Sequence, residues 1–354
     1  MGLKILHSAD WHLDAPFGGF TQEQREALRR EQLLLPDKIV SLAQREKCGL
    51  ILLAGDLFDG QPSPQTVEQV RRALGGCGIR VLIAPGNHDF YGPDSVWQQE
   101  RWPDNVYIFK SGLKAISLPD LDCRIYGAAF RSMDCPSLLE GFHAEGEETY
   151  KIAVLHGDPT QRNSPYNPVT TAQVRGSGLS YLALGHIHAA GAFRSGETIC
   201  AWPGCPMGRG WDETGEKGVC VVTLDQKPSI QAVSLDTVRF LSARVDIGDD
   251  AAAAIEAALP GAGSRDFYRI DLTGCGKVDT KALKEKFPGF PNLELRDQTE
   301  PPFEIWPENN SDTLEGVYFG MLRRRMEQEP ENAQRIQRAA EISRRLLLGR
   351  EVTL

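Results

Sequence analysis

The sequence lacks the features of several protein classes. No continuous apolar stretch reaches the about 18 residues that a membrane-spanning helix needs, and the first five residues read as a short strand rather than as the start of a secretion signal. There is no internal repeat and no low-complexity tract. Hydrophobic residues make up 41% and charged residues 25% of the chain, which is typical of a folded globular protein. We therefore expect a soluble cytoplasmic protein rather than a disordered or membrane-embedded one.

The chain also lacks an excess of positive charge. Lysine and arginine total 39 against 48 acidic residues, so the formal net charge is −9. A strongly basic chain attracts nucleic acid by releasing counterions, and this chain as a whole does not have that property. A polyanionic substrate would need local binding groups or a partner that supplies them.

The eight cysteines form no C-x-x-C pair, and most lie in apolar segments typical of strands. This pattern favours buried free thiols in a reducing compartment over a disulfide framework. Cys200 and Cys205 are close enough in sequence to share a metal ion, but without further ligands nearby we favour buried thiols for them too.

The 354 residues allow two domains, or one large domain with an appendage. In the first part of the chain, apolar runs typical of buried strands alternate with helical segments, which predicts a layered α/β domain over 1–228. Alternating short strands and helices over 235–307 predict a small α+β domain. Two arginine-rich amphipathic helices are predicted over 312–354.

Local signals define the predicted helices near the N-terminus. Thr21-x-x-Gln24 is a capping-box pattern and begins a helical segment that extends to about Lys47, with an interruption expected at Pro36. Ser63-Pro64 supplies an N-cap and a first-turn proline for the next helix.

Histidines are few, but five of the seven lie in short polar clusters that each follow an apolar run. The clusters are Asp10-Trp11-His12, Gly86-Asn87-His88-Asp89, His156-Gly157-Asp158 and Gly185-His186-Ile187-His188, and an acidic cluster, Gly55-Asp56-Leu57-Phe58-Asp59, follows another such run. Residues at the carboxyl ends of strands in an α/β sheet meet at one edge. Their mixed oxygen and nitrogen donors suit Mn, Fe, Zn or Co better than Ca.

Seven candidate ligands are too many for one ion but suffice for two ions that share a carboxylate. Two ions ~3.5–4 Å apart can clamp both the attacking and the leaving oxygen of a phosphoester. His186 and His188 are two residues apart, so an extended backbone would place both side chains on one face. Each ion would then receive one of the two imidazoles.

These five motifs, in this order, resemble those of the calcineurin-like metallophosphoesterases, over roughly residues 1–225. The opening motif and Gly55-Asp56-Leu57-Phe58-Asp59 are most similar to the DNA-repair exonuclease branch, typified by the SbcD nuclease subunit and its compact YhaO-type relatives. A protein-phosphatase identity is less favoured, because Gly60 and Asp89 stand where those enzymes have Arg and Glu.

The resemblance implies a fold of two central mixed β-sheets flanked by helices and a centre of two divalent ions, usually Mn²⁺. It implies seven metal ligands: Asp10, His12, Asp56 and His188 for the first ion, and Asp56, Asn87, His156 and His186 for the second, with Asp56 shared. His88 would assist catalysis as a residue that binds no metal, and Asp89 would orient its ring. A hydroxide activated by the two ions would attack the phosphorus of a DNA phosphodiester.

The same resemblance implies two partners, DNA and a large coiled-coil SMC-like ATPase that docks on the C-terminal helices. The alternative for these helices is a solvated amphipathic pair packed on its own domain, and a homodimer remains open. Two other functions remain open. One is hydrolysis of small phosphoesters such as cyclic nucleotides, and the other is a non-catalytic subunit braced by metal.

Several residues near the motifs have two possible uses. Arg209 and Glu213 either line a substrate groove or hold a turn by an ion pair. Trp11, Phe58 and Phe90 either stack on bases or pack around the metal site. Asp14 and Asp158 either support metal ligands through hydrogen bonds or cap turns. His7 and His143 match no motif and are expected to be structural.

Overall fold

The computed structural model describes residues 2–261, 263–301, 303–306, 312–349 and 352. It divides into two units. Unit 1 comprises Met1–Ser242, Ser264–Arg269 and Phe290–Leu293, and unit 2 comprises Ala243–Gly263, Ile270–Gly289 and Glu294–Leu354.

Unit 1 contains two six-stranded mixed β-sheets, as expected. The first has the order β12 (Ser229–Ser234), β11 (Gly218–Leu224), β1 (Leu3–Ser8), β2 (Leu50–Leu53), β3 (Arg80–Ile83) and β4 (Val106–Ile108). The second has the order β5 (Lys114–Leu118), β6 (Cys123–Gly127), β7 (Tyr150–His156), β8 (Tyr181–Gly185), β10 (Thr198–Trp202) and β9 (Gly191–Ser195). Strands β1 to β4 are parallel, as are β6, β7, β8 and β10. The carboxyl ends of neighbouring strands therefore lie together within each sheet.

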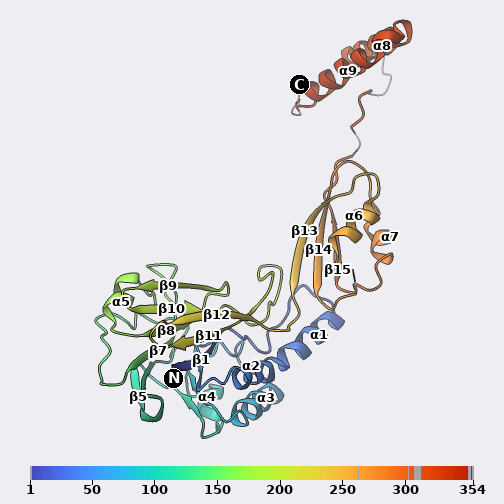
Figure 1. The fold of residues 1–354 in the computed structure, drawn as a ribbon. Coiled ribbons are helices and arrows are strands. Elements are labelled where there is room, and N and C mark those ends of the chain that lie inside the picture. Colours follow the sequence, from blue (N-terminus) through green and yellow to red (C-terminus); the bar gives the residue numbers. More distant parts are fainter. Residues whose placement is uncertain (1, 262, 302, 307–311, 350–351, 353–354) are drawn as a thin grey trace. The chain divides into compact units, whose positions relative to one another are not determined.

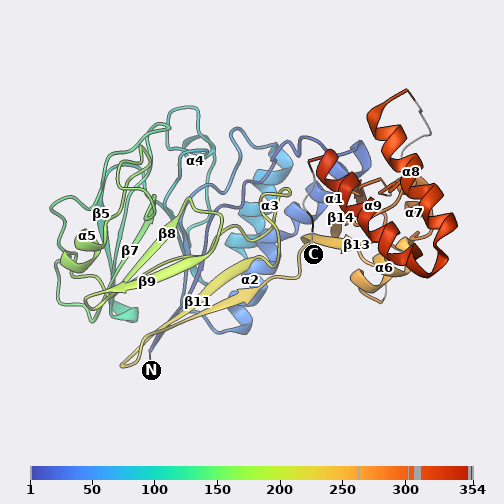
Figure 2. The same ribbon diagram turned by 90° about the horizontal axis from the view of Figure 1, so that it is seen from above.

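Helices cover the outer faces of both sheets. They are α1 (Gln22–Leu33), α2 (Leu35–Arg45), α3 (Pro64–Gly75), α4 (Val96–Gln99) and α5 (Thr171–Gly176). The 3₁₀ turn η1 (Pro119–Leu121) connects β5 to β6, and its Leu121 packs against the core between the sheets. Figures 1 and 2 show α2 and α3 on one side of unit 1 and α5 on the opposite side. The interruption predicted at Pro36 is confirmed, since α1 ends at Leu33 and Pro36 lies in the first turn of α2.

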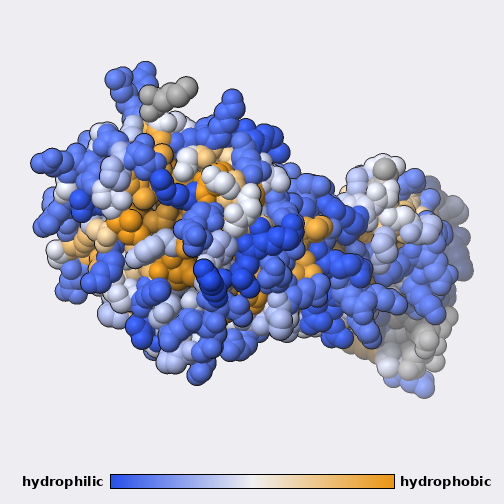
Figure 3. All heavy atoms as spheres, turned by 90° about the horizontal axis from the view of Figure 1, so that it is seen from below, coloured by the Kyte–Doolittle hydropathy of each residue, from blue (hydrophilic) through white to orange (hydrophobic). Residues whose placement is uncertain are grey.

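The alternation of side chains along the strands produces separate cores. In β2, Leu50 and Leu52 pack between the two sheets, whereas Ile51 and Leu53 pack against α1, α2 and α3. Both faces of this strand are buried, which explains its continuous apolar sequence. Hydrophilic side chains cover most of the face drawn in Figure 3, with apolar ones between them. No helix in the described part of the chain is long and apolar enough to cross a membrane.

A three-stranded sheet of β13 (Phe240–Asp246), β14 (Phe267–Thr273) and β15 (Leu293–Asp297) contributes residues to both units. Unit 2 also contains α6 (Ala251–Ala258), α7 (Thr280–Glu285), α8 (Leu314–Gln328), η2 (Pro330–Asn332) and α9 (Ala333–Leu347). The predicted segment 235–307 is therefore shared, because 235–242, 264–269 and 290–293 belong to unit 1. Residues 262, 302, 307, 350, 351, 353 and 354 of the two predicted C-terminal regions lie outside the described residues.

The cysteines are free thiols, and all except Cys275 are buried, as predicted. Burial raises the pKa of the Cys205 thiol to about 12. This favours the protonated form over the thiolate that binds metal.

His7 is a fully buried polar residue between the sheets. Its Nδ1 lies 2.7 Å from the Tyr181 hydroxyl and its Nε2 3.0 Å from the Leu184 carbonyl oxygen, so a neutral ring accepts from the first and donates to the second. Burial lowers the pKa of His7 from 6.5 to about 3, although the hydrogen bond to Leu184 acts in the opposite direction. The unfolded chain therefore binds a proton here below pH 6.5 that the folded chain does not.

We expect this difference to weaken the fold in acid. The stabilisation from neutral His7 is complete above pH 6.5 and is lost as pH falls toward about 3. Between pH 7 and 5 the loss is about 2 kcal/mol of unfolding free energy. Urea unfolding at pH 7 and pH 5 measures this loss. Between the two pH values, the unfolding free energy of His7→Gln should fall by about 2 kcal/mol less than that of the wild type. Equal losses would show that His7 does not titrate in this way.

Candidate metal centre

The polar clusters follow β1, β2 and β3 in the first sheet and β7 and β8 in the second. Hydrogen bonds join these clusters. Within the first sheet, the His12 amide donates to the Asp56 carbonyl (2.9 Å), and between the two sheets the His186 amide donates to the Asp10 carboxylate (2.9 Å). The structure thus brings all seven predicted ligands together at the carboxyl ends of these strands.

The backbone at this place is unusual. Asp10, His12, Asp56 and His186 all have positive φ angles, of 55°, 43°, 53° and 96°. Such conformations are costly for residues other than glycine and concentrate at functional sites. A side chain at Gly86 would collide with the carboxylate of Asp56, so glycine is required there for the loops to approach so closely.

One group of donors consists of Asp10, His12 and His188. The Nε2 atoms of His12 and His188 lie only 3.2 Å apart, and Asp56 Oδ2 lies 3.6 Å from His12 Nε2. Two imidazole nitrogens aimed at each other, with carboxylates beside them, are the donors expected around one transition-metal ion.

A second group surrounds the Asn87 amide oxygen. Asn87 Oδ1 lies 2.9 Å from His156 Nε2 and 3.3 Å from His186 Nδ1. Asp56 Oδ2 lies 3.4 Å from the same His156 nitrogen. Because His156 Nδ1 is 2.8 Å from the Ala54 carbonyl and donates to it, Nε2 keeps its lone pair for a cation. Asp56 therefore lies between the two groups, in the place of a shared ligand.

Burial and charge at the centre also suit cations. Asp10 and Asp56 are almost completely buried. Burial raises the pKa of Asp10. Burial acts the same way on Asp56, but the neighbouring His156 and His12 outweigh it and hold the Asp56 pKa below its usual value. Buried carboxylates of this kind need nearby positive charge, so the donor set fits divalent metal ions.

His88 stands beside the donors and differs from them in exposure, since 42% of its side chain is accessible. Its Nδ1 lies 3.0 Å from Asp59 Oδ1, and this hydrogen bond raises the pKa of His88. The expectation that Asp89 orients this ring is wrong. Asp89 instead accepts hydrogen bonds from the amides of Gly86 (2.8 Å) and Leu57 (2.8 Å).

Two geometric facts explain this correction. Adjacent residues His88 and Asp89 direct their side chains to different places, and the loop after β2 brings Asp59 to the ring instead. The Asp89 side chain is buried and joins the loops after β2 and β3 by hydrogen bonds. Burial raises the pKa of Asp89 to about 7. Asp59 belongs to the Gly55-Asp56-x-x-Asp59 motif, so its position was visible in the sequence although its role was not.

Glu213 is a further residue at the centre. Its Oε1 accepts a hydrogen bond from His188 Nδ1 at 2.7 Å, and Arg209 Nη2 donates to the same oxygen at 2.7 Å. Glu213 is buried, with 5% exposed. With its Nδ1 proton held by Glu213, His188 presents Nε2 toward His12. Such carboxylate partners fix the tautomer and orientation of metal-binding histidines.

Removing Glu213 should weaken metal binding. We expect Glu213→Ala to lower Mn²⁺ affinity about 10–100-fold, the usual cost of losing a partner of a metal-ligating histidine. Calorimetric titration of metal-free protein measures this. Glu216→Ala, which changes an exposed glutamate of the same loop, is the matched control. If Glu213→Ala bound Mn²⁺ as tightly as Glu216→Ala, Glu213 would stabilise only the turn and would have no role in metal binding.

Asp14 and Asp158, the acids near the motifs, and His143 form hydrogen bonds away from the proposed metal ligands. Asp14 accepts from the Ser63 amide and the Thr66 hydroxyl, and Asp158 accepts from Thr160. Both are turn or capping contacts. His143 lies at the surface and contacts the Gly176 carbonyl oxygen.

Comparison with known proteins gives a consistent result. The family model for calcineurin-like phosphoesterase matches residues 3–190. The metallophosphoesterase YhaO of Bacillus subtilis is 32% identical over 237 residues, 62% of this chain and 57% of YhaO. The SbcD component of the nuclease SbcCD from the same organism is 25% identical, over 65% of this chain and 68% of that protein.

A third relative is the DNA double-strand break repair protein Mre11 of Aeropyrum pernix. It is 27% identical over 273 residues, which is 70% of this chain and 64% of Mre11. The chain thus spans less than two thirds of YhaO and of Mre11.

Proposed function

Because the chain belongs to the calcineurin-like phosphoesterases, we propose that it is a metal-dependent phosphodiesterase that cleaves DNA. The observation that carries this proposal is the placement of Asp56 between two groups of metal donors, with the accessible ring of His88 beside them.

In this proposal, Asp10, His12, Asp56 and His188 hold one divalent ion, and Asp56, Asn87, His156 and His186 hold the other. Bound divalent ions, for which we propose Mn²⁺, supply positive charge that neutralises phosphate oxygens and activates water.

His88 acts on the leaving group. Its Nδ1 is held by Asp59, which leaves Nε2 as the nitrogen that can reach a substrate. The same carboxylate raises the pKa of His88 and so favours the protonated ring. A protonated imidazole can stabilise the charge that develops on the phosphate and give a proton to the departing sugar oxygen.

DNA as the substrate is supported by the relatives. SbcCD is named as a nuclease and Mre11 as a protein of DNA double-strand break repair. We propose the same substrate class and a role in DNA repair for this chain, with cleavage from strand ends as the first activity to test.

The test compares four substrates with Mn²⁺: end-labelled single-stranded DNA, end-labelled double-stranded DNA, bis(p-nitrophenyl) phosphate and a cyclic nucleotide. We expect degradation of DNA and hydrolysis of the chromogenic ester. Hydrolysis of the cyclic nucleotide with no DNA cleavage would instead establish a small-phosphoester enzyme. Inactivity on all four with Mn²⁺ bound would favour a non-catalytic subunit.

The C-terminal helices support a second part of the proposal, the docking of a partner. Apolar side chains on α8 are exposed, among them Leu314 (88%), Met321 (59%), Val317 (42%) and Tyr318 (40%). SbcD is named as one component of a larger nuclease. We propose that α8 and α9 bind a large coiled-coil ATPase of the kind that the resemblance implies.

Deletion of residues 312–354 should separate docking from catalysis. We expect the shortened chain to lose co-purification with a co-expressed ATPase of this class, because the exposed apolar side chains of α8 are removed. Hydrolysis of bis(p-nitrophenyl) phosphate, measured in parallel, should persist. Unchanged co-purification would remove the docking proposal.

A further inference from the structure

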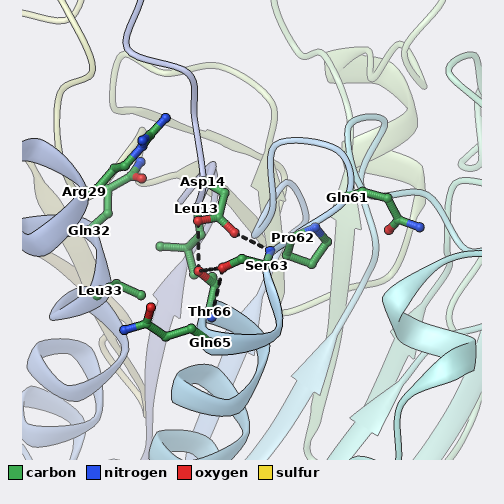
Figure 4. A pocket seen from close by; sticks show the side chains of 10 residues that line it. All are labelled: Leu13, Asp14, Arg29, Gln32, Leu33, Gln61, Pro62, Ser63, Gln65 and Thr66. Carbon is green, nitrogen blue, oxygen red and sulfur yellow. Dashed lines mark hydrogen bonds between the residues drawn. The ribbon is translucent and has the colours of Figure 1, made fainter. Parts of the chain in front are cut away.

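A pocket of about 500 Å³ lies in unit 1 between α1 and the loops that follow β1 and β2. We call it the amide pocket. Its lining residues are Leu13, Asp14, Arg29, Gln32, Leu33, Gln61, Pro62, Ser63, Gln65 and Thr66. Figure 4 shows Arg29 and Gln32 on one side, opposite Asp14, Ser63 and Thr66, which hydrogen bonds join. The volume is within the ~300–1,000 Å³ typical of sites for small molecules.

Gln32 is the informative residue of this pocket. It is 2% exposed, and its Nε2 donates to the backbone carbonyl of the metal-site residue His12 at 2.9 Å. Because a carbonyl oxygen only accepts, the end of the Gln32 amide that faces His12 is the nitrogen. The other end, Oε1, is buried and has no hydrogen-bond partner among the described residues. Buried acceptors normally have a hydrogen-bond donor. An N–H or O–H of a ligand would supply the donor that Gln32 Oε1 lacks among the described residues.

The lining of the amide pocket contains one acidic and one basic side chain, Asp14 and Arg29, so an anion would bind at Arg29. Asp14 is the one acidic residue in the lining, and its carboxylate already accepts from the Ser63 amide at 2.6 Å and the Thr66 hydroxyl at 2.9 Å. Arg29 supplies a positive charge. A ligand with both a phosphate and a planar group bearing N–H donors would match Arg29 and Gln32 together.

The amide pocket also adjoins the catalytic region. Gln61 lines it and lines a smaller pocket of about 300 Å³ that contains His88 and Phe90. A chain of nucleotides could therefore pass from one pocket along Gln61 to His88.

We propose that the amide pocket is a subsite for one nucleotide of the DNA strand adjacent to the cleaved bond, which rests on the proposed function. Arg29 pairs with a backbone phosphate, and Gln32 Oε1 accepts an N–H from the base. Every DNA base has an N–H at its pairing edge, so one acceptor does not discriminate strongly between sequences. Glutamine amides are suited to such base-edge contacts.

Binding of a fluorescent, phosphorothioate-linked pentathymidylate tests this subsite. We expect Arg29→Ala to weaken binding about 5–10-fold, and the slope of log affinity against log salt to become shallower by about 0.7, as for one lost phosphate contact on a single strand. Arg30→Ala is the matched control, because Arg30 is an exposed arginine of the same helix outside the lining. It should change affinity less than two-fold. Equal effects of the two substitutions would overturn the proposal.

A second comparison tests the base contact. The wild type should bind the pentathymidylate more tightly than the same strand with abasic sugars. Gln32→Met should reduce that difference, with Mn²⁺ content measured to verify that the nearby centre is intact. An undiminished difference in the metal-loaded variant would contradict the assignment of Gln32.

Failure of the subsite and failure of the proposed function give different results. If the wild type cleaves ordinary DNA but Arg29→Ala binds like Arg30→Ala, the subsite is wrong and the function stands. If the wild type binds the strand through Arg29 but never cleaves DNA, the amide pocket is a nucleotide-binding site and the proposed function is wrong.

Discussion

Substitution of His88 by alanine should lower kcat for DNA cleavage by about 10²–10⁴-fold, the range for losing a general acid. His88 lies beside the donors, but its Nδ1 is committed to Asp59, and the two proposed ligand sets do not include it. The variant should therefore keep its full content of Mn²⁺, measured by elemental analysis. This combination of lost turnover and retained metal distinguishes a catalytic group from a ligand.

His143→Ala is the control, because His143 lies at the surface and its ring forms a hydrogen bond with the Gly176 carbonyl oxygen, away from the donor groups. It should keep both activity and metal. Full DNA cleavage by His88→Ala with its metal content unchanged would remove His88 from the mechanism.

The second large effect is expected from Asp56→Asn. The change is nearly isosteric and keeps an oxygen that can accept the His88 amide, which donates to Asp56 Oδ1 at 2.9 Å. It removes the negative charge that lies 3.6 Å from His12 Nε2 and 3.4 Å from His156 Nε2. Because both proposed ions share this carboxylate, we expect Mn²⁺ affinity and kcat each to fall by at least about 100-fold.

Asp158→Asn controls for the loss of a buried acid near the site, since Asp158 is a buried turn residue that holds Thr160. It should bind Mn²⁺ nearly as well as the wild type. Normal metal binding by Asp56→Asn would show that no ion depends on Asp56.

The seven candidate ligands could be found from sequence because each follows an apolar run directly. A strand buried on both faces is easy to recognise, and its carboxyl end determines where the next residues lie. The break near Pro36 followed from a similarly local pattern, whereas the two mixed sheets were implied by the resemblance to the family. Such features depend on near neighbours in the chain.

Contacts between distant segments could not be read in this way. Asp89 is next to His88 in sequence, yet Asp59, from another loop, holds the ring. Glu213 reaches His188 from a loop 25 residues away, and its sequence context is equally typical of a turn. The limits of unit 1 likewise depend on 264–269 and 290–293, which join it through tertiary packing.

The central claim is that Asp56 is shared by two cations. Anomalous scattering from crystals grown with excess Mn²⁺ tests it most directly. We predict two manganese peaks per chain, one on each side of the Asp56 carboxylate, between the His12 and His188 rings and beside Asn87 and His156. A single peak, or peaks remote from Asp56, would contradict the account.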